Sequence, residues 1–376
     1  MTDVVQLLRD LVALPSVNPC GGEPDDTHGE GRVVEYLVQW LAERKIDHEL
    51  QEVWPGRHNV IVRLSGSRGP SVVFEAHTDT VEIQNMEIEP FAPELREGRV
   101  YGRGSCDDKA SLAAMLVALE RTAERGTPPG DITLAATVDE EYRFSGVKYM
   151  VDHGFRADGA VVGEPTQLQL IVAHKGALRS QIITHGKAWH SSEPDKGESA
   201  IFHMARVLTA IEDYARELAK RPKHPLVNGP TISVGQINGG HAPNIVPDRC
   251  EIAIDRRIMP GEVPEVVEQE LRDWLTGRLE GVPWEMYIRL NDGGLEGSPD
   301  SPIAQRCAAA LDRVLGGHVT AGVQYGTDAS KFAAAGTPAV VLGPGDIAQA
   351  HTAVEWVEVG QVKTAVEVYA EIMWPR

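Results

Sequence analysis

Four short apolar runs along the chain predict buried parallel strands. They occupy residues 72–74, 132–136, 160–162 and 339–342. Continuous apolar runs of this length are typical of strands that helices cover on both faces. Amphipathic segments predict helices over residues 3–14, 31–45 and 109–125. The pattern therefore predicts an α/β domain with a mostly parallel sheet flanked by helices.

A middle segment, residues 175–289, has a different rhythm. Strands are predicted at residues 177–184, 231–237, 249–258 and 285–290, and helices at residues 199–220 and 263–279. The order β-α-β-β-α-β is that of ferredoxin-like α+β domains. A chain of 376 residues is also long enough for two domains. We expect a discontinuous catalytic domain, residues 1–174 and 290–376, interrupted by an inserted domain at 175–289.

Carboxylate and imidazole side chains follow each of the four apolar runs. They are His77 with Asp79, Glu140 with Glu141, Glu164, and His351, and the Asp107–Asp108 pair before the helix at 109–125 joins them. In open α/β sheets, ligands bind at the carboxyl ends of the strands. The joint pattern predicts a metallohydrolase.

Two divalent ions about 3.5–4 Å apart need a bridging carboxylate and further protein ligands on each ion. His77 and His351 can each bind one ion, and Asp107 can bridge them. Glu141 and Glu164 can each add one carboxylate. This donor set suits Zn²⁺, with Co²⁺ or Mn²⁺ tolerated.

Two further acids are expected to act without binding metal. Asp79 lies two residues after His77 and can accept the second N–H of its ring. Glu140 lies beside the ligand Glu141 and is the natural general base for the attacking water.

Each of these motifs has a simpler interpretation when it is taken alone. An isolated Glu-Glu pair after a strand is usually a solvated turn, and the Asp107–Asp108 pair could be a helix N-cap. Cys106 could be a sulfur ligand, but a small buried side chain is the better interpretation. The order of all the motifs together favours the metal centre.

Composition narrows the partners and the compartment. The balance of 36 basic against 55 acidic residues gives a net charge of −19, which argues against nucleic acid or an anionic membrane surface as a partner. The first 15 residues resemble an amphipathic helix and not a signal peptide, and no apolar stretch is long enough to span a bilayer. The four cysteines form no CxxC pair, so we expect reduced thiols and a cytoplasmic location.

The motifs resemble those of the M20 family of metallohydrolases, which includes acetylornithine deacetylase, succinyl-diaminopimelate desuccinylase, aminoacylase and glutamate carboxypeptidase relatives. HTDTV, YGRGSCDDKAS, VDEE, GEPT and QAHTAVEWV occur in family order over essentially the whole chain. HGKAWHSSEPDKGESAI, NIVPDRCEIAIDRRIMPGE and YGTDASKF extend the resemblance. One departure is Ala353-Val354, where relatives usually carry Pro-Asp, and it bears on the loop after His351.

The resemblance implies roles for the inserted domain. It would be a lid that dimerises, with His190 of one subunit completing the site of the other, and with Asn244 and Arg257 contacting the substrate. From the residues alone, a structural role is the better interpretation of His190. Only one of Arg256 and Arg257 can point at a site, because neighbours on a strand face opposite sides. The resemblance also implies a cis peptide bond after Asp107.

The expected function is that of a dinuclear-metal amidohydrolase acting on an N-acyl-α-amino acid, as acetylornithine deacetylase does. A metal-dependent carboxypeptidase or dipeptidase acting on a short peptide is the alternative, and a catalytically silent binding protein is a remote one. The expected assembly is a homodimer formed through the lid.

Overall fold

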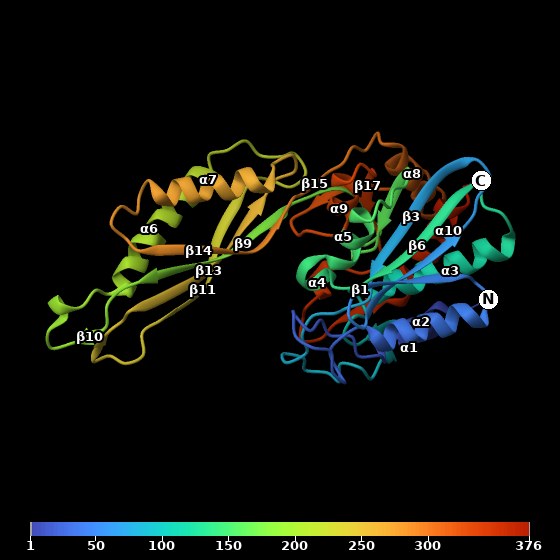
Figure 1. Ribbon diagram of the computed structural model, residues 1–376. Helices are drawn as coiled ribbons and strands as arrows, with labels where there is room; N and C mark the ends of the chain where they lie inside the picture. Colours follow the sequence, from blue (N-terminus) through green and yellow to red (C-terminus); the bar gives the residue numbers. More distant parts are fainter. Residues whose placement is uncertain (1, 376) are drawn as a thin grey trace. The chain divides into compact units, whose positions relative to one another are not determined.

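The apolar runs of the sequence form the middle of a nine-stranded sheet in the computed structural model, which describes residues 2–375 (Figure 1). The strand order is β1-β2-β6-β3-β7-β17-β8-β15, with β16 paired to β8. In chain order, the strands of this sheet are β1 (His48–Trp54), β2 (Arg57–Leu64), β3 (Gly69–His77), β6 (Gly130–Thr137), β7 (Gly159–Val162), β8 (Leu170–His174), β15 (Leu295–Glu296), β16 (Thr320–Val323) and β17 (Ala339–Val341).

The centre of this sheet is parallel and its edges are antiparallel. Strands β6, β3, β7 and β17 run parallel to one another. Strand β2 pairs antiparallel with both β1 and β6, and β8 pairs antiparallel with β17 and β15. The turn between β1 and β2 contains only Pro55 and Gly56, and so short a connection can join only antiparallel strands. The sheet is therefore mixed, and its parallel part carries the predicted site.

Helices cover the sheet, and three of them lie where the sequence predicted them. The helices of this part of the chain are α1 (Val4–Val12), α2 (Gly31–Glu43), α3 (Lys109–Arg125), α4 (Glu140–Arg143), α5 (Ser145–Asp152), α8 (Pro302–Leu315), α9 (Ala329–Ala334) and α10 (Val359–Met373), with a 3₁₀ turn η2 (Ile347–Gln349). Helix α1 ends two residues earlier than predicted because Leu14 precedes Pro15, and a residue before proline disfavours the helical conformation. Helix α3 is buried along almost its whole length, as expected for a helix at the centre of a domain.

A small sheet consists of β18 (Trp356–Glu358), β5 (Arg99–Tyr101) and β4 (Glu94–Arg96).

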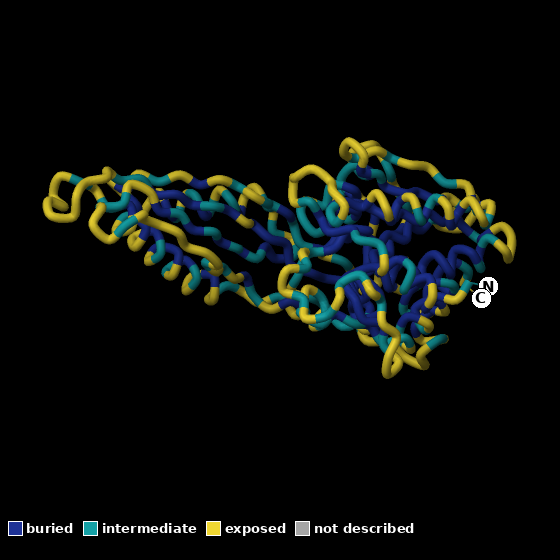
Figure 2. Tube along the Cα trace, turned by 90° about the horizontal axis from the view of Figure 1, so that it is seen from below, coloured by how far each residue is buried: buried dark blue, intermediate teal, exposed yellow. Residues whose placement is uncertain are grey.

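The chain separates into two compact units. Unit 1 comprises Met1–Val172, Gly297–Ala321 and Thr327–Arg376, and unit 2 comprises Ala173–Glu296 and Gly322–Gly326. The expected insertion at 175–289 lies within unit 2, which extends a few residues further at each end and also takes in a short segment from late in the chain. Buried segments run through the interior of each unit (Figure 2).

Unit 2 has the predicted β-α-β-β-α-β order. Its elements are β9 (Gly176–His185), α6 (Ala200–Leu218), β11 (Thr231–Gly239), β13 (Arg249–Ile258), α7 (Pro264–Thr276) and β14 (Trp284–Asp292). The sheet order β11-β13-β9-β14 is antiparallel throughout, which is the ferredoxin-like arrangement. Two short strands, β10 (Trp189–His190) and β12 (Ile245–Val246), pair with each other, and a 3₁₀ turn η1 (Pro194–Lys196) follows β10.

The sheet of unit 2 has one apolar face and one polar face. Along β13, Ile252 and Ile254 are buried in the core with side chains of α6 and α7. Glu251 and Asp255 alternate with them and face the other side. This alternation is typical of an antiparallel sheet that helices cover on one face only.

Among the described residues, none of the helices has both the length and the apolar character that crossing a membrane requires.

We predict that unit 2 depends on a glycine at the start of β9. A Cβ atom at Gly176 would lie 2.1 Å from the carbonyl oxygen of Asp292, a backbone atom that cannot move aside independently. Gly176→Ala should therefore lower the free energy of unfolding by about 1–3 kcal/mol. Gly235→Ala is the matched control on β11, because a Cβ there meets nothing within 4 Å. Urea denaturation measures the free energy of unfolding of both variants. Equal losses in the two would contradict this packing.

Candidate metal centre

The fold places the predicted site residues at the ends of neighbouring elements of unit 1. His77 is the last residue of β3, Glu140 and Glu141 open α4 after β6, Glu164 follows β7, Asp107 precedes α3, and His351 follows the 3₁₀ turn η2. Strands β6, β3 and β7 are adjacent and parallel, so their carboxyl ends meet at one edge of the sheet. The peptide bond between Asp107 and Asp108 is cis, as the family resemblance implies.

Among the residues that the structure describes, three overlapping groups of side chains could hold metal ions, each with ligand atoms within 4.8 Å of one another. One group contains His77, Asp107 and Glu164, and a second contains Asp107, Glu141 and His351. The third contains His77, Glu140 and Glu141. The structure therefore brings together all five predicted ligands and the predicted base. Because the first two groups share Asp107, they have the connectivity of a two-ion site.

Asp107 lies between the two histidines. Its Oδ1 is 3.0 Å from Nε2 of His77, and its Oδ2 is 3.3 Å from Nε2 of His351. The same His351 nitrogen is 3.3 Å from Oε1 of Glu141. Each oxygen of Asp107 thus faces a different imidazole, which is the arrangement that a bridging carboxylate requires.

Burial sets the electrostatics of this cluster. Desolvation raises the pKa values of Glu140 and Glu164 well above the usual range for glutamate. Hydrogen bonds with Asp107 and Glu141 raise the pKa of His351 to about 10. Burial lowers the pKa of His77, but hydrogen bonds with Asp107 and Asp79 outweigh burial and hold it well above its usual value. Without bound metal, Glu140, Glu164 and the two histidines therefore keep their protons to a higher pH than usual. Their nitrogen and oxygen atoms are ligand types that fit divalent cations.

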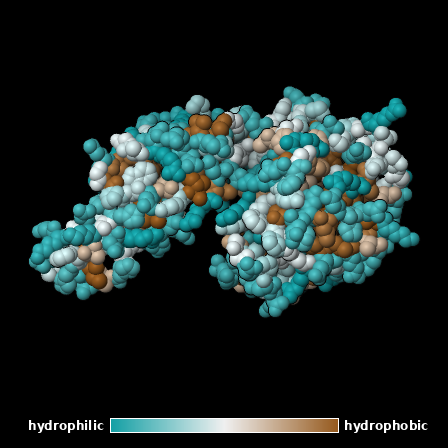
Figure 3. All heavy atoms as spheres, in the orientation of Figure 1, coloured by the Kyte–Doolittle hydropathy of each residue, from teal (hydrophilic) through white to brown (hydrophobic). Residues whose placement is uncertain are grey.

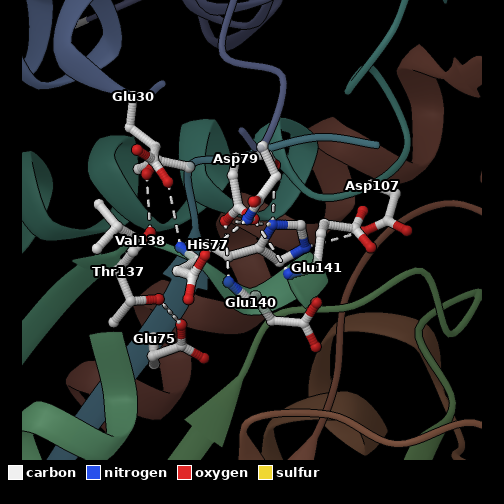
Figure 4. Close-up of polar contacts among 12 residues, drawn as sticks. Glu30, Glu75, His77, Asp79, Asp107, Thr137, Val138, Glu140 and Glu141 are labelled. Carbon is white, nitrogen blue, oxygen red and sulfur yellow. Dashed lines mark hydrogen bonds and ion pairs between the residues drawn. The ribbon is translucent and has the colours of Figure 1, made fainter. Parts of the chain in front are cut away.

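Asp79 contacts the turn that carries Glu140 and Glu141 (Figure 4). Its Oδ1 accepts the backbone N–H of Glu140 and its Oδ2 that of Glu141, each at 3.1 Å. Nδ1 of His77 is 3.0 Å from the Asp79 carbonyl oxygen and 3.6 Å from the carboxylate. The acceptor nearest to the His77 ring is thus the Asp79 carbonyl and not the expected carboxylate. The carboxylate instead faces the backbone of the turn that follows β6.

A buried polar network supports Asp79 from behind, and the sequence analysis missed it. The Nδ2 group of Asn18 donates to Asp79 at 2.7 Å and to Asp139 at 3.0 Å. Arg57 pairs with Asp139 at 3.1 Å and donates from Nε to Glu30 at 2.7 Å. Asp139 belongs to the VDEE motif, but Asn18, Glu30 and Arg57 lie far from it in the sequence, so no local signal could have connected these residues.

A second missed residue, Glu75, carries a local signal. It lies two residues before His77 on β3, so both side chains are on one face of the strand. The hydroxyl of Thr137 donates to the Glu75 carboxylate at 2.5 Å, and burial raises the pKa of this carboxylate well above its usual range (Figure 4). An acid inside an otherwise apolar run is unusual enough to have marked this position.

Glu355 holds the loop that carries Asp107. Its Oε1 accepts the backbone N–H of Cys106 at 2.9 Å and of Asp107 at 3.1 Å, and its Oε2 accepts from Arg103 at 2.5 Å. Cys106 is buried, its thiol lies 3.4 Å from the carbonyl oxygen of Asp346, and it belongs to none of the candidate metal groups found among the described residues. The geometry therefore favours the interpretation of Cys106 as a small buried side chain and not as a metal ligand.

The Ala353-Val354 departure leaves the flanking residues in place. His351 joins the cluster and Glu355 makes its buried contacts on the other side of the departure. The carbonyl of Ala353 accepts the backbone N–H of Glu87 at 2.9 Å, which fixes this loop to a neighbouring segment.

The predicted lid residues all lie in unit 2. His190 and Asn244 are exposed and adjacent, since Ser191 N–H donates to the Asn244 carbonyl at 3.0 Å. The side chain of His190 lies 2.7 Å from the hydroxyl of Ser192. Arg256 is fully buried and paired with Glu262, whereas the neighbouring Arg257 lies on the polar face of the sheet. Only Arg257 of this pair is therefore available to a ligand.

Comparison with known proteins gives the same grouping. Residues 73–374 match the sequence profile of peptidase family M20/M25/M40. An acetylornithine deacetylase from Proteus mirabilis (strain HI4320) is 30% identical over 376 aligned residues, covering 98% of this chain and 95% of that protein.

Solved structures share the fold. An M20 family metallo-carboxypeptidase from Sulfolobus solfataricus has a TM-score of 0.83 at 18% identity, covering 99% of each chain. A dinuclear metal binding peptidase of the M20 family from Bacillus subtilis has a TM-score of 0.70 at 17% identity, covering 98% of this chain and 96% of that one. The profile match and the near full-length deacetylase relative show that this chain belongs to peptidase family M20/M25/M40 and is a hydrolase of amide bonds.

Proposed function

We propose that this protein is a two-metal amidohydrolase that removes the acyl group from an N-acyl-α-amino acid. The observation that carries the proposal is the pair of ligand groups that share Asp107, with the carboxylate of Glu140 beside them. The acetylornithine deacetylase relative from Proteus mirabilis supports an N-acyl amino acid as the substrate class.

The proposed metal ligands divide into two sets. His77 and Glu164 would hold one ion, His351 and Glu141 the other, and Asp107 both. Zn²⁺ is the first choice for this mixture of imidazole and carboxylate donors, and Co²⁺ or Mn²⁺ are alternatives. When bound, the ions would polarise the scissile carbonyl and lower the pKa of the attacking water.

Glu140 is the proposed general base. It is only 8% exposed, and its carboxylate makes no hydrogen bond with any other described residue, whereas its backbone N–H is fixed by Asp79. A carboxylate held in this way can take a proton from the water that attacks the carbonyl and return it to the departing nitrogen.

The lid residues are proposed to bind the substrate. Arg257 would pair with the α-carboxylate, Asn244 would add a polar contact, and His190 of the partner subunit would polarise the scissile carbonyl. A guanidinium fork matches the geometry of a carboxylate, which supports the role of Arg257.

A homodimer formed through the lid is the proposed assembly. The outer edge of β11 is unpaired among the described residues, and this strand carries Ile237, which is 55% exposed. Helix α6, on the covered face of the same sheet, exposes Ile201 and Phe202, the latter by 76%. The visible surface of the molecule is otherwise largely hydrophilic with scattered apolar patches (Figure 3). An exposed edge strand beside exposed apolar residues is suited to a second copy of the chain.

A metal-dependent carboxypeptidase or dipeptidase is the second candidate, and the fold shared with the metallo-carboxypeptidase favours it. The same residues would then cleave a short peptide. A catalytically silent binding protein is disfavoured because all five proposed ligands and the proposed base are present in the candidate groups. We also propose a cytoplasmic location, which the absence of a disulfide among Cys20, Cys106, Cys250 and Cys307 supports.

We predict that Glu140→Gln abolishes catalysis without removing metal. The variant should bind two divalent ions per chain while kcat falls by about 10²–10⁴-fold, the range for loss of a general base. Glu141→Gln is the matched control and should lose metal as well. Elemental analysis together with steady-state kinetics checks both variants, and metal loss in the Glu140 variant would show that the two roles are exchanged.

A further prediction concerns the substrate carboxylate. Amidating the α-carboxylate of an N-acetyl amino acid should lower kcat/KM by at least about tenfold, because a hydrogen bond to a charged group contributes about 1.5–3 kcal/mol. Parallel assays with dipeptides that carry a free amine separate the two candidate functions. Faster turnover of the dipeptides than of any N-acyl amino acid would favour the peptidase.

Another prediction concerns assembly. If His190 acts in the partner's site, a mixture of inactive His190→Ala and Glu140→Gln subunits should recover part of the activity, because each heterodimer contains one intact site. Subunit exchange must be demonstrated separately by mass spectrometry of tagged chains. An exchanged mixture that stays inactive would place His190 in its own subunit's site or outside catalysis.

A further inference from the structure

Asp255 lies between two arginines on the polar face of the unit 2 sheet. Its Oδ1 is 2.9 Å from Nε of Arg257, and its Oδ2 accepts from Nε of Arg179 at 3.1 Å. Asp255 and Arg257 are two residues apart on β13, so they share a face of the strand. Arg179 is the cross-strand partner of Asp255 on β9. The Asp255 carboxylate is therefore fixed from two strands at once.

This contact determines which part of Arg257 is available. Asp255 is the only acid paired with Arg257 among residues 2–375, and Nε is the guanidinium nitrogen that lies nearest to it. The terminal Nη groups are left at the far end of a side chain that is 29% exposed. Arg256 differs, because its terminal nitrogen is used by Glu262 and by a backbone carbonyl in a fully buried position.

Two further cationic side chains lie near Arg257 and Asp255. Lys175 lies close enough that, after burial, the charges of Arg257 and Arg256 contribute to lowering its pKa. Arg179 stands on the other side of Asp255. A flexible guanidinium among like charges would spread over several rotamers, and fixing it before binding reduces the entropy that the ligand must overcome.

We propose that Asp255 is a positioning residue that orients Arg257 so that its Nη groups are presented end-on to the substrate's α-carboxylate. The inference rests on the proposed role of Arg257 in binding that carboxylate. Asp255 itself would not touch the substrate, because its two oxygens are used by Arg257 and Arg179. Its loss should therefore weaken recognition of the carboxylate and leave the chemical step unaffected.

The test compares an N-acetyl amino acid with its α-amide as substrates of Asp255→Asn. For the acid, KM should rise by about tenfold, the loss expected when a charge-assisted contact is misplaced, with kcat within about twofold of the parent enzyme. For the amide, kcat/KM should stay within about twofold of the parent value, because it has no carboxylate for Arg257 to bind. Asp255→Glu keeps the charge and should restore part of the acid's KM.

Glu251→Gln is the matched control. Glu251 lies on the same strand and face and pairs with Arg249 at 2.6 Å, but it makes no contact with Arg257. This variant should keep the parent KM for both substrates. Arg257→Gln supplies the reference, since it should abolish the preference for the acid over the amide.

Each outcome separates this inference from the proposed function. An unchanged KM in Asp255→Asn, alongside lost discrimination in Arg257→Gln, would overturn the positioning role and leave the proposed function standing. Equal losses of kcat/KM for acid and amide in Asp255→Asn would show a structural role. If Asp255→Asn does not fold, Asp255→Glu takes its place in the test. An Asp255→Glu variant that binds the acid no better than the amide would also show a structural role. Retained discrimination in Arg257→Gln would refute the carboxylate role of Arg257, and the inference about Asp255 would fail with it.

Discussion

Asp107, Glu140 and Glu164 are carboxylates buried close to one another, and removing several negative charges from water is costly unless cations or donors compensate. Two imidazoles face Asp107 directly, and this is the first compensation. Much of the polar structure around the site provides a second compensation for the buried negative charge. Backbone N–H groups, buried arginines and an asparagine amide bind the acids behind the centre, which are Asp79, Asp139, Glu30 and Glu355, and so hold the surrounding loops in place.

The compensating groups also fix the positions of the proposed ligands and base. Glu355 accepts two successive N–H groups at the Asp107 loop, and Asp79 does the same at the Glu140–Glu141 turn. In both cases a buried acid accepts hydrogen bonds from the backbone at a proposed site residue and not from its side chain. Precise geometry at a catalytic site needs such support behind the reacting groups, and here it is built into the ends of strands and helices.

The strand ends, helix α3 and the order of elements in unit 2 could be predicted because apolar periodicity is a local property of sequence. The antiparallel pairing of β2 with β6 and of β8 with β17 could not, because pairing direction depends on which strands become neighbours. The contact of Asn18 with Asp79 and Asp139 was equally out of reach, since it joins residues far apart in the chain. Period-two alternation did foresee that Arg256 and Arg257 face opposite sides, but only the packing of α6 and α7 determines which side is covered.

The order of strands in the large sheet bears on how the protein is made. Strand β17 pairs with β7 and with β8, yet it follows them by more than 160 residues of chain. During synthesis from the N-terminus, β7 must therefore wait with one edge unpaired while the strands of unit 2, which are contiguous in sequence, can already pair. His351 is added later still, so the candidate metal-binding cluster cannot be complete on a nascent chain until residue 351 has left the ribosome. A waiting strand edge is open to incorrect pairing, and the step most exposed to misfolding would be this late completion of the sheet.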